Sequence, residues 1–225
     1  MEYRTDMGWH LILFDLMDTV LADPFFPAIR SFLDEEGIRQ WAALRRPGIF
    51  EAFEKGEITE REYFRKFYDD RPVPSHMPPV ARIKKRMFKS VQFRPGMDEI
   101  LKDLYHRDDL VLGIASNYSA WYHDVLEKRP ELDSWFDFLF FSCEMGVRKP
   151  DNEYFEIIEQ SVLERSGKDG TPESIWFFDD RPANLKPARN RGWQAQLVGI
   201  RSSDRADAPA IQDEIVQPLK HAGIL

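Results

Sequence analysis

Short, unbroken apolar runs that alternate with helical stretches are the strongest constraint on the fold of this 225-residue chain. Five such runs have the character of strands: residues 10–14, 110–115, 137–142, 174–178 and 195–200. They are continuously apolar rather than alternating, which is typical of strands buried on both faces of a parallel sheet. Helical patterns separate most of them, at 97–106, 119–128, 151–165 and 182–191. Strand then helix, repeated, predicts right-handed crossovers and an α/β fold with a doubly wound parallel sheet.

The connection between the first two runs is far longer than an ordinary strand-to-helix loop, at about ninety residues. Its composition is mostly helical, and Thr59 and Glu62 have the spacing of a capping box at a helix start. We predict a small helical cap domain at residues 21–93, folded over the active edge of the sheet. Residues 1–20 and 94–225 form the predicted core domain. A helical decoration without a catalytic role is the alternative interpretation.

Composition limits the partners and the location of the chain. The formal net charge of −8 argues against nucleic acid as the main partner, since a phosphate backbone requires a basic face. No apolar run approaches the ~20 residues of a membrane helix, and the apolar stretch near the N-terminus stops at Asp15. The single cysteine, Cys143, excludes an intramolecular disulfide and has the surroundings of a packed thiol. We expect a cytoplasmic monomer or homodimer that binds neither membrane nor nucleic acid.

Polar residues gather where the predicted strands end. Asp15 follows the first strand, Ser116-Asn117 the second, and Asp179-Asp180 the fourth, while Lys149 lies between the third strand and a helix. Singly, each residue also suits a helix cap, a turn or a solvated surface. Together they are harder to explain in that way, because the carboxyl ends of parallel strands meet at one edge of the sheet. Carboxylates there suit Mg²⁺, and a hydroxyl with a cation suits the oxygens of a transferring group.

The order and spacing of these motifs resemble the haloacid dehalogenase superfamily of hydrolases over essentially the whole chain. The four similar motifs are 14–20 (FDLMDTV), 111–117 (VLGIASN), Lys149-Pro150 and 177–184 (FFDDRPAN). The 179–191 stretch (DDRPANLKPARNR) is also similar to the phosphatase domain at the N-terminus of soluble epoxide hydrolases. The resemblance implies subfamily I, with a type-one helical cap between the first two motifs, where residues 21–93 fall.

The resemblance also implies a role for each motif residue. Asp15 attacks phosphorus and forms an aspartyl-phosphate that water hydrolyses. Thr19 and Ser116 donate hydrogen bonds to phosphoryl oxygens, and Lys149 neutralises charge on the nucleophile and the phosphoryl group. Asn117 completes the substrate-binding candidates, although its amide, like that of Asn184, also suits a supporting or capping role.

The implied cofactor is Mg²⁺, and the implied substrate is a small phosphorylated molecule. The metal ligands by resemblance are Asp15, Asp180 and the backbone carbonyl of Met17, with Asp179 helping directly or through water. Phosphatases of this family usually carry an acid–base aspartate at the position of Met17, and a thioether cannot exchange protons. Loss of such help typically lowers a rate by ~10²–10⁴-fold.

Two functional hypotheses therefore remain. The first is a working Mg²⁺-dependent phosphatase of small phosphorylated metabolites that is slower on alkyl esters. The second is a catalytically degenerate protein that binds Mg²⁺ and a phosphorylated ligand or partner without efficient turnover. Met17 favours the second hypothesis, while Asp15, Ser116, Lys149 and the Asp179-Asp180 pair favour the first.

Overall fold

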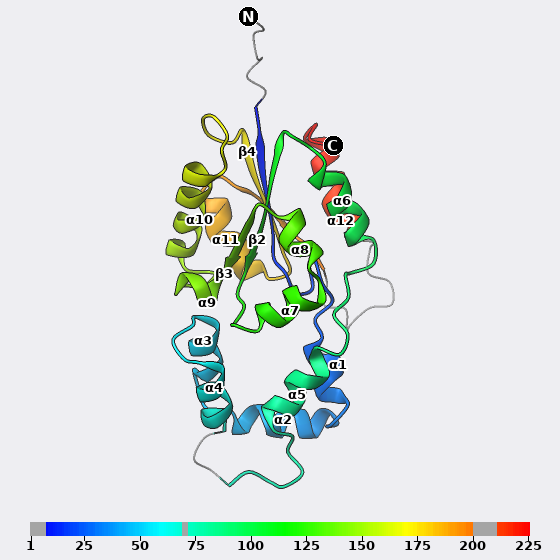
Figure 1. The fold of residues 1–225 in the computed structure, drawn as a ribbon, viewed down its shortest axis with the longest axis vertical. Helices are drawn as coiled ribbons and strands as arrows, with labels where there is room; N and C mark the ends of the chain where they lie inside the picture. The colour runs from blue at the N-terminus through cyan, green and yellow to red at the C-terminus, as the bar shows by residue number, and fades with distance from the viewer. Residues whose placement is uncertain (1–7, 69–71, 200–210) are drawn as a thin grey trace, which may run out of the picture.

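The strands predicted from the apolar runs form one parallel sheet in the order β3-β2-β1-β4-β5. The computed structural model describes residues 8–68, 72–199 and 211–225. The strands are β1 (His10–Phe14), β2 (Leu110–Ser116), β3 (Phe138–Phe141), β4 (Ser174–Asp179) and β5 (Gln194–Leu197). Figure 1 shows them running together toward one end of the sheet. The predicted α/β class is confirmed.

Helices cover both faces of this sheet, as a doubly wound fold requires (Figure 1). On one face Ile12 and Phe14 share a core with α6 (Met97–Tyr105) and α12 (Ile211–His221). On the other, Leu11 and Leu13 share a core with α10 (Asn152–Arg165) and α11 (Pro182–Asn190). Successive residues of β1 thus enter opposite cores, which is why the strand is continuously apolar. The shorter helices of this part are α7 (Tyr122–Lys128), α8 (Glu131–Trp135) and α9 (Ser142–Met145).

Two predicted elements differ from the structure by more than one residue at an end. The helix expected from residue 119 begins at Tyr122, because Ser119 starts a turn in which its Oγ accepts from the Trp121 amide. The strand expected over 195–200 ends at Leu197, and a left-handed glycine follows at 199, with φ 70°. Residue 200 lies outside the described residues. Among the described residues, no helix combines the length and the apolar character that crossing a membrane requires.

Five helices of the long insert gather beyond the carboxyl ends of the strands (Figure 1). They are α1 (Phe25–Arg30), α2 (Glu35–Leu44), α3 (Ile49–Glu54), α4 (Glu60–Lys66) and α5 (Val80–Met87). Aromatic contacts build their core, with ring centroids 4.4 Å apart for Phe53 and Tyr63 and 4.7 Å apart for Trp41 and Phe67. The predicted capping box is confirmed, since Thr59 and Glu62 satisfy each other's backbone amides at the start of α4.

The two chain segments that enter and leave the insert pair with each other. Leu21 and Phe93 form an antiparallel bridge, and the Ala22 amide donates to the Gln92 carbonyl at 3.0 Å. The Arg94 amide donates to the Val20 carbonyl at 3.0 Å. The pairing lies at the predicted ends of the insert, so both connections leave the core at one place. The division into a core and a cap domain stays a prediction.

Candidate active site

A buried lysine joins two carboxylates at the carboxyl ends of the central strands. Lys149, whose side chain is 1% exposed, donates to Asp15 Oδ1 at 2.8 Å and to Asp179 Oδ2 at 2.6 Å. Its third acceptor is the Ala115 carbonyl at 2.6 Å, just before the end of β2. Three strands therefore contribute to one ammonium group. Burial alone would lower the pKa of Lys149, but the Asp15 and Asp179 carboxylates outweigh it and raise that pKa, so the lysine is cationic.

Asp179 is a positioning residue for this lysine. Both of its carboxylate oxygens accept from the Asn184 amide nitrogen at 3.0 Å, and Oδ1 also accepts from the Arg181 backbone amide at 2.8 Å. With Lys149 on Oδ2, both oxygens are saturated and the side chain is fully buried. A metal contact by Asp179, direct or through water, stays a prediction. Asn184 thus has the supporting role that its amide suggested.

Asn117 also supports Lys149. Its side-chain nitrogen donates to the Lys149 carbonyl, and its side-chain oxygen accepts from the Lys149 amide, both at 2.8 Å. This pair of bonds fixes the backbone of the Lys149-Pro150 segment against the end of β2. A substrate contact by Asn117 stays a prediction.

A small pocket of about 50 Å³ opens beside the Lys149 ammonium. Seven of the residues singled out in the sequence line it: Asp15, Met17, Ser116, Asn117, Lys149, Asp180 and Asn184. They meet because parallel strands end at one edge of the sheet. Thr19 does not line the pocket, and its Oγ1 is buried with no hydrogen-bond partner among the described residues. The role of Thr19 in binding the phosphoryl group stays a prediction.

The loop after β1 turns sharply around its own carbonyls. The amides of Val20 and Leu21 both donate to the Leu16 carbonyl, and Asp18 adopts a left-handed conformation with φ 57°. Asp is one of the few side chains that tolerate this conformation. The guanidinium of Arg94 donates to the Asp18 carbonyl and fixes the loop from the far end of the insert. The turn leaves the Met17 side chain partly exposed in the pocket.

The residues at this site fit a divalent cation. The Asp180 side chain is 9% exposed, and its ion pair with Arg181 is long at 3.9 Å. Burial, together with Asp15 and Asp179, raises the pKa of Asp180 to about 7, which marks excess negative charge. No group of three or more His, Cys, Asp or Glu side chains at metal-binding spacing occurs in the described ranges. An ion here would therefore use the Asp15 and Asp180 carboxylates with a main-chain carbonyl and water.

A second, larger cavity of about 230 Å³ adjoins this pocket under the helices of the insert. Aromatic side chains dominate its walls, namely Phe25, Phe26, Trp41, Phe50, Tyr63, Tyr118 and Trp121. Its few charged residues include Arg45, Glu54 and Arg181. The small polar pocket suits an anion, and the aromatic cavity suits a flat or apolar organic group. Helices α1 to α4 of the insert therefore supply walls of a cavity beside the site.

Sequence reasoning missed two acidic residues of this region. Asp23 lines both cavities, and burial raises the pKa of its carboxyl to about 6. Glu54 ends α3 and pairs with Arg148 at 2.9 Å, which joins the insert to the segment before α10. Asp23 had a sequence signal, an acidic residue just before Pro24, but that pattern indicates a helix start.

Cys143 is half-buried, and burial raises the pKa of its thiol to about 12, so it is a poor nucleophile.

Comparisons with known proteins agree with this arrangement. Residues 12–198 match the family described as haloacid dehalogenase-like hydrolase. The chain is 33% identical over 180 residues to flavin mononucleotide hydrolase 1, a chloroplast protein of Arabidopsis thaliana, a match covering 79% of this chain and 67% of the relative. It is 35% identical over 68 residues to bifunctional epoxide hydrolase 2 of Rattus norvegicus, which covers 30% of this chain and only 11% of that protein.

Solved structures share the fold. The HAD-hydrolase YfnB of Bacillus subtilis, solved with bound magnesium, is 18% identical with a TM-score of 0.65, covering 96% of this chain and all of that one (100%). A HAD family enzyme of Bacteroides thetaiotaomicron, solved with magnesium and inorganic phosphate, is 22% identical with a TM-score of 0.61. That match covers 88% of this chain and 98% of the other. By its family match and its fold, this chain belongs to the haloacid dehalogenase-like hydrolases.

Proposed function

We propose that this protein is a Mg²⁺-dependent phosphatase that hydrolyses phosphate monoesters through Asp15. The observation that carries the proposal is the contact of 2.8 Å between Asp15 and the Lys149 ammonium, both in the wall of one small polar pocket. A carboxylate held beside a cation is suited to attack an anionic phosphoryl group, because the cation offsets the repulsion between the two anions.

The chain's own residues then have the following tasks. One Asp15 oxygen attacks phosphorus and forms an aspartyl-phosphate, which water hydrolyses. Lys149, held by Asp179 and Ala115, stabilises the charge on Asp15 and on the phosphoryl oxygens. Ser116, at the end of β2, donates a hydrogen bond to a phosphoryl oxygen. Asp15, Asp180 and the Met17 carbonyl would hold Mg²⁺, which would further neutralise the phosphate charge.

The aromatic cavity supports a flat or apolar organic group as the leaving group. Seven aromatic side chains line it, and it shares lining residues with the phosphate pocket. Flat ring systems stack on such walls with a gain of about 0.5–1.5 kcal/mol per aromatic pair. The plant relative is named for hydrolysis of flavin mononucleotide, a phosphate monoester with a large flat ring system. Flavin mononucleotide is therefore the first candidate substrate for this chain.

The second candidate function is binding of a phosphorylated ligand without efficient turnover. The observation that favours it is Met17, a thioether in the wall of the phosphate pocket that cannot exchange protons. Cytoplasmic location and a monomeric or homodimeric state stay predictions from the sequence.

Phosphate release separates the two functions. The wild-type chain and the Asp15→Asn variant are incubated with flavin mononucleotide or p-nitrophenyl phosphate, with Mg²⁺ or with EDTA. We expect Mg²⁺-dependent release by the wild type and none above background by Asp15→Asn. Release that persists in Asp15→Asn would contradict the proposed nucleophile. Saturable binding of flavin mononucleotide without any release would favour the binding function.

A further inference from the structure

Four residues lie at the junction of the phosphate pocket and the aromatic cavity. Met17, Asp23, Asn117 and Arg181 line both spaces. A monoester with its phosphoryl group beside Asp15 and its organic group in the cavity has its bridging oxygen at this junction. That oxygen leaves as an alkoxide unless a proton reaches it. Arg181 does not give up its proton, and the thioether and the amide have none to exchange, so Asp23 is the one acid among the four.

We infer that Asp23 is the acid–base residue of this site, which protonates the leaving oxygen of alkyl phosphate monoesters and then activates the hydrolytic water. The inference rests on the proposed phosphatase function and extends it to a residue that the sequence did not suggest. It also explains how a site with Met17 can supply a proton. The proton comes from the hinge, which is the paired segments 20–23 and 92–94 at the ends of the insert, and not from the turn after β1.

Backbone contacts hold the Asp23 carboxyl at this place. Its Oδ1 accepts from the Phe25 amide at 2.8 Å, the first amide of α1, and its own amide donates to Asp18 Oδ1 at 3.2 Å. The neighbouring residue Ala22 is fixed by its bond to Gln92 in the other segment of the hinge. Asp23 is therefore positioned by the same pairing that joins the insert to the core.

The surrounding charges suit proton exchange near neutral pH. Burial raises the pKa of Asp23 to about 6; the amide of Phe25 and the charge of Arg181 oppose this, while Asp18 and Asp15 add to it. From the α5 side, Arg86 and Lys89 share a pocket wall with Asp23. A carboxyl with a pKa close to the working pH can act first as an acid and then as a base.

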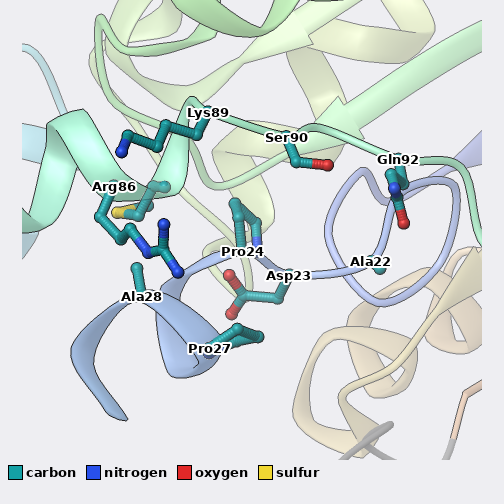
Figure 2. Close-up of a pocket in the computed structure, with 10 residues that line it drawn as sticks. Ala22, Asp23, Pro24, Pro27, Ala28, Arg86, Lys89, Ser90 and Gln92 are labelled. Atoms are coloured by element: carbon teal, nitrogen blue, oxygen red, sulfur yellow. The ribbon is translucent and has the colours of Figure 1, made fainter. Parts of the chain in front are cut away.

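A third pocket connects Asp23 to solvent. This outer pocket, of about 290 Å³, lies between α1 and the segment after α5. Figure 2 shows the Asp23 carboxyl inside it, with Arg86 and Lys89 on the opposite wall. Among the described residues, Asp23 is the one that lines all three of these pockets. Bulk water therefore reaches one side of the residue and can restore its proton state.

The two steps balance. In the first, Asp15 forms a bond to phosphorus, the bond from phosphorus to the bridging oxygen breaks, and that oxygen takes the proton of Asp23. In the second, a water oxygen attacks phosphorus, the bond between phosphorus and Asp15 breaks, and the Asp23 carboxylate takes a proton from the water. The products are the free alcohol and inorganic phosphate, with Asp15 and the protonated Asp23 restored.

Two other carboxyls compete for this role, and neither lies at the junction. Asp18 lines the phosphate pocket but not the aromatic cavity, and its Oδ1 is engaged by the Asp23 amide. Glu54 lines the aromatic cavity but not the phosphate pocket, and it pairs with Arg148. Asp18→Asn and Glu54→Gln are therefore matched variants, since each replaces one nearby carboxyl with an amide of similar size.

The test varies the leaving group. Wild type, Asp23→Asn, Asp18→Asn and Glu54→Gln are assayed with Mg²⁺ on flavin mononucleotide, an alkyl ester, and on p-nitrophenyl phosphate, an aryl ester that needs no acid. Asparagine keeps an oxygen for the Phe25 amide, so the start of α1 remains. We expect Asp23→Asn to lower kcat on the alkyl ester by ~10²–10⁴-fold. On the aryl ester we expect a rapid burst of one p-nitrophenolate per chain, because the first step survives and the second is slow.

Two results would overturn the inference. One is an Asp23→Asn variant whose ratio of alkyl to aryl kcat equals that of the wild type, without a burst. The other is a selective loss of turnover of the alkyl ester in Asp18→Asn or Glu54→Gln and not in Asp23→Asn. If the protein is not a phosphatase, the result differs: the wild type then releases no more phosphate than Asp15→Asn from either ester. That result would also rule out the role of Asp23.

Discussion

The Lys149 ammonium lies 2.8 Å from Asp15 Oδ1, and their side chains are only 1% and 11% exposed. Removing the cation leaves Asp15 and Asp179 as buried carboxylates without compensation. We expect Lys149→Met to abolish phosphate release and to lower the free energy of unfolding by about 3–5 kcal/mol. Urea denaturation measures the loss. Lys102→Met is the matched control, because Lys102 is 54% exposed and its ion pair spans 3.7 Å. It should change the free energy of unfolding by less than about 0.5 kcal/mol. If both variants lost the same stability, the buried ion pairs of Lys149 would not be the source of the effect.

If Asp180 is a Mg²⁺ ligand, replacing it should change the stability of the fold and its response to Mg²⁺. Burial and the neighbouring carboxylates raise its pKa to about 7, so ionising it at pH 8 destabilises the metal-free fold. We expect metal-free Asp180→Asn to be more stable than the metal-free wild type at pH 8, by about 1–3 kcal/mol. Mg²⁺ should raise the Tm of the wild type but not of Asp180→Asn.

Exposed Asp133 provides the control for that comparison. Asp133→Asn should leave both the metal-free stability and the response to Mg²⁺ unchanged. If Mg²⁺ stabilised Asp180→Asn as strongly as the wild type, Asp180 would not be a metal ligand.

Glu54 makes the stability of the fold depend on pH. Burial raises its pKa from 4.5 to about 7, although Arg148 opposes this shift. The folded chain thus keeps a proton that the unfolded chain has lost between these values. Its contribution is complete below pH 4.5 and disappears as pH rises through about 7. We expect Glu54→Gln to reduce the fall in unfolding free energy between pH 5 and pH 8 by about 1–3 kcal/mol. Chemical denaturation at the two pH values measures it, with the exposed Glu153→Gln as control. If Glu54→Gln lost as much unfolding free energy between pH 5 and pH 8 as the wild type, Glu54 would not be the cause of the pH dependence.

Met17 distinguishes a site that lacks an acid from one that has it elsewhere. We expect Met17→Asp alone to change alkyl-ester turnover little, because Asp23 already supplies the proton. In the Asp23→Asn background, the same substitution should raise alkyl-ester turnover at least about tenfold. Steady-state kcat on flavin mononucleotide measures both effects. A large rise in the single variant would mean that Asp23 does not serve the leaving group.

The fold was largely readable from the sequence because its signals are local. Strands buried on both faces must be continuously apolar, and β1 begins and ends where that pattern predicts. The meeting of Asp15, Ser116 and Lys149 followed from the topology, since parallel strands end at one edge. These predictions needed no knowledge of long-range packing.

The remaining features depend on contacts between distant segments. Asp23 looks like a helix start in the sequence, and only the pairing of Leu21 with Phe93 and the position of α5 place it between three pockets. Glu54 and Arg148 carry no motif and meet only because α3 lies against α9. Thr19 matches its motif in spacing, but its buried hydroxyl has no hydrogen-bond partner among the described residues, so its role stays a prediction.

The most direct test of the proposed phosphatase is the trapping of a phosphoryl group on Asp15. The Asp23→Asn variant, in which the second step is slow, is mixed with p-nitrophenyl phosphate and Mg²⁺, quenched in acid and analysed by peptide mass. We predict one added phosphoryl group on the peptide that contains Asp15, and none when Asp15→Asn is added to the same chain. Turnover with an unmodified Asp15 peptide, or a phosphoryl group on another residue, would contradict nucleophilic attack by Asp15.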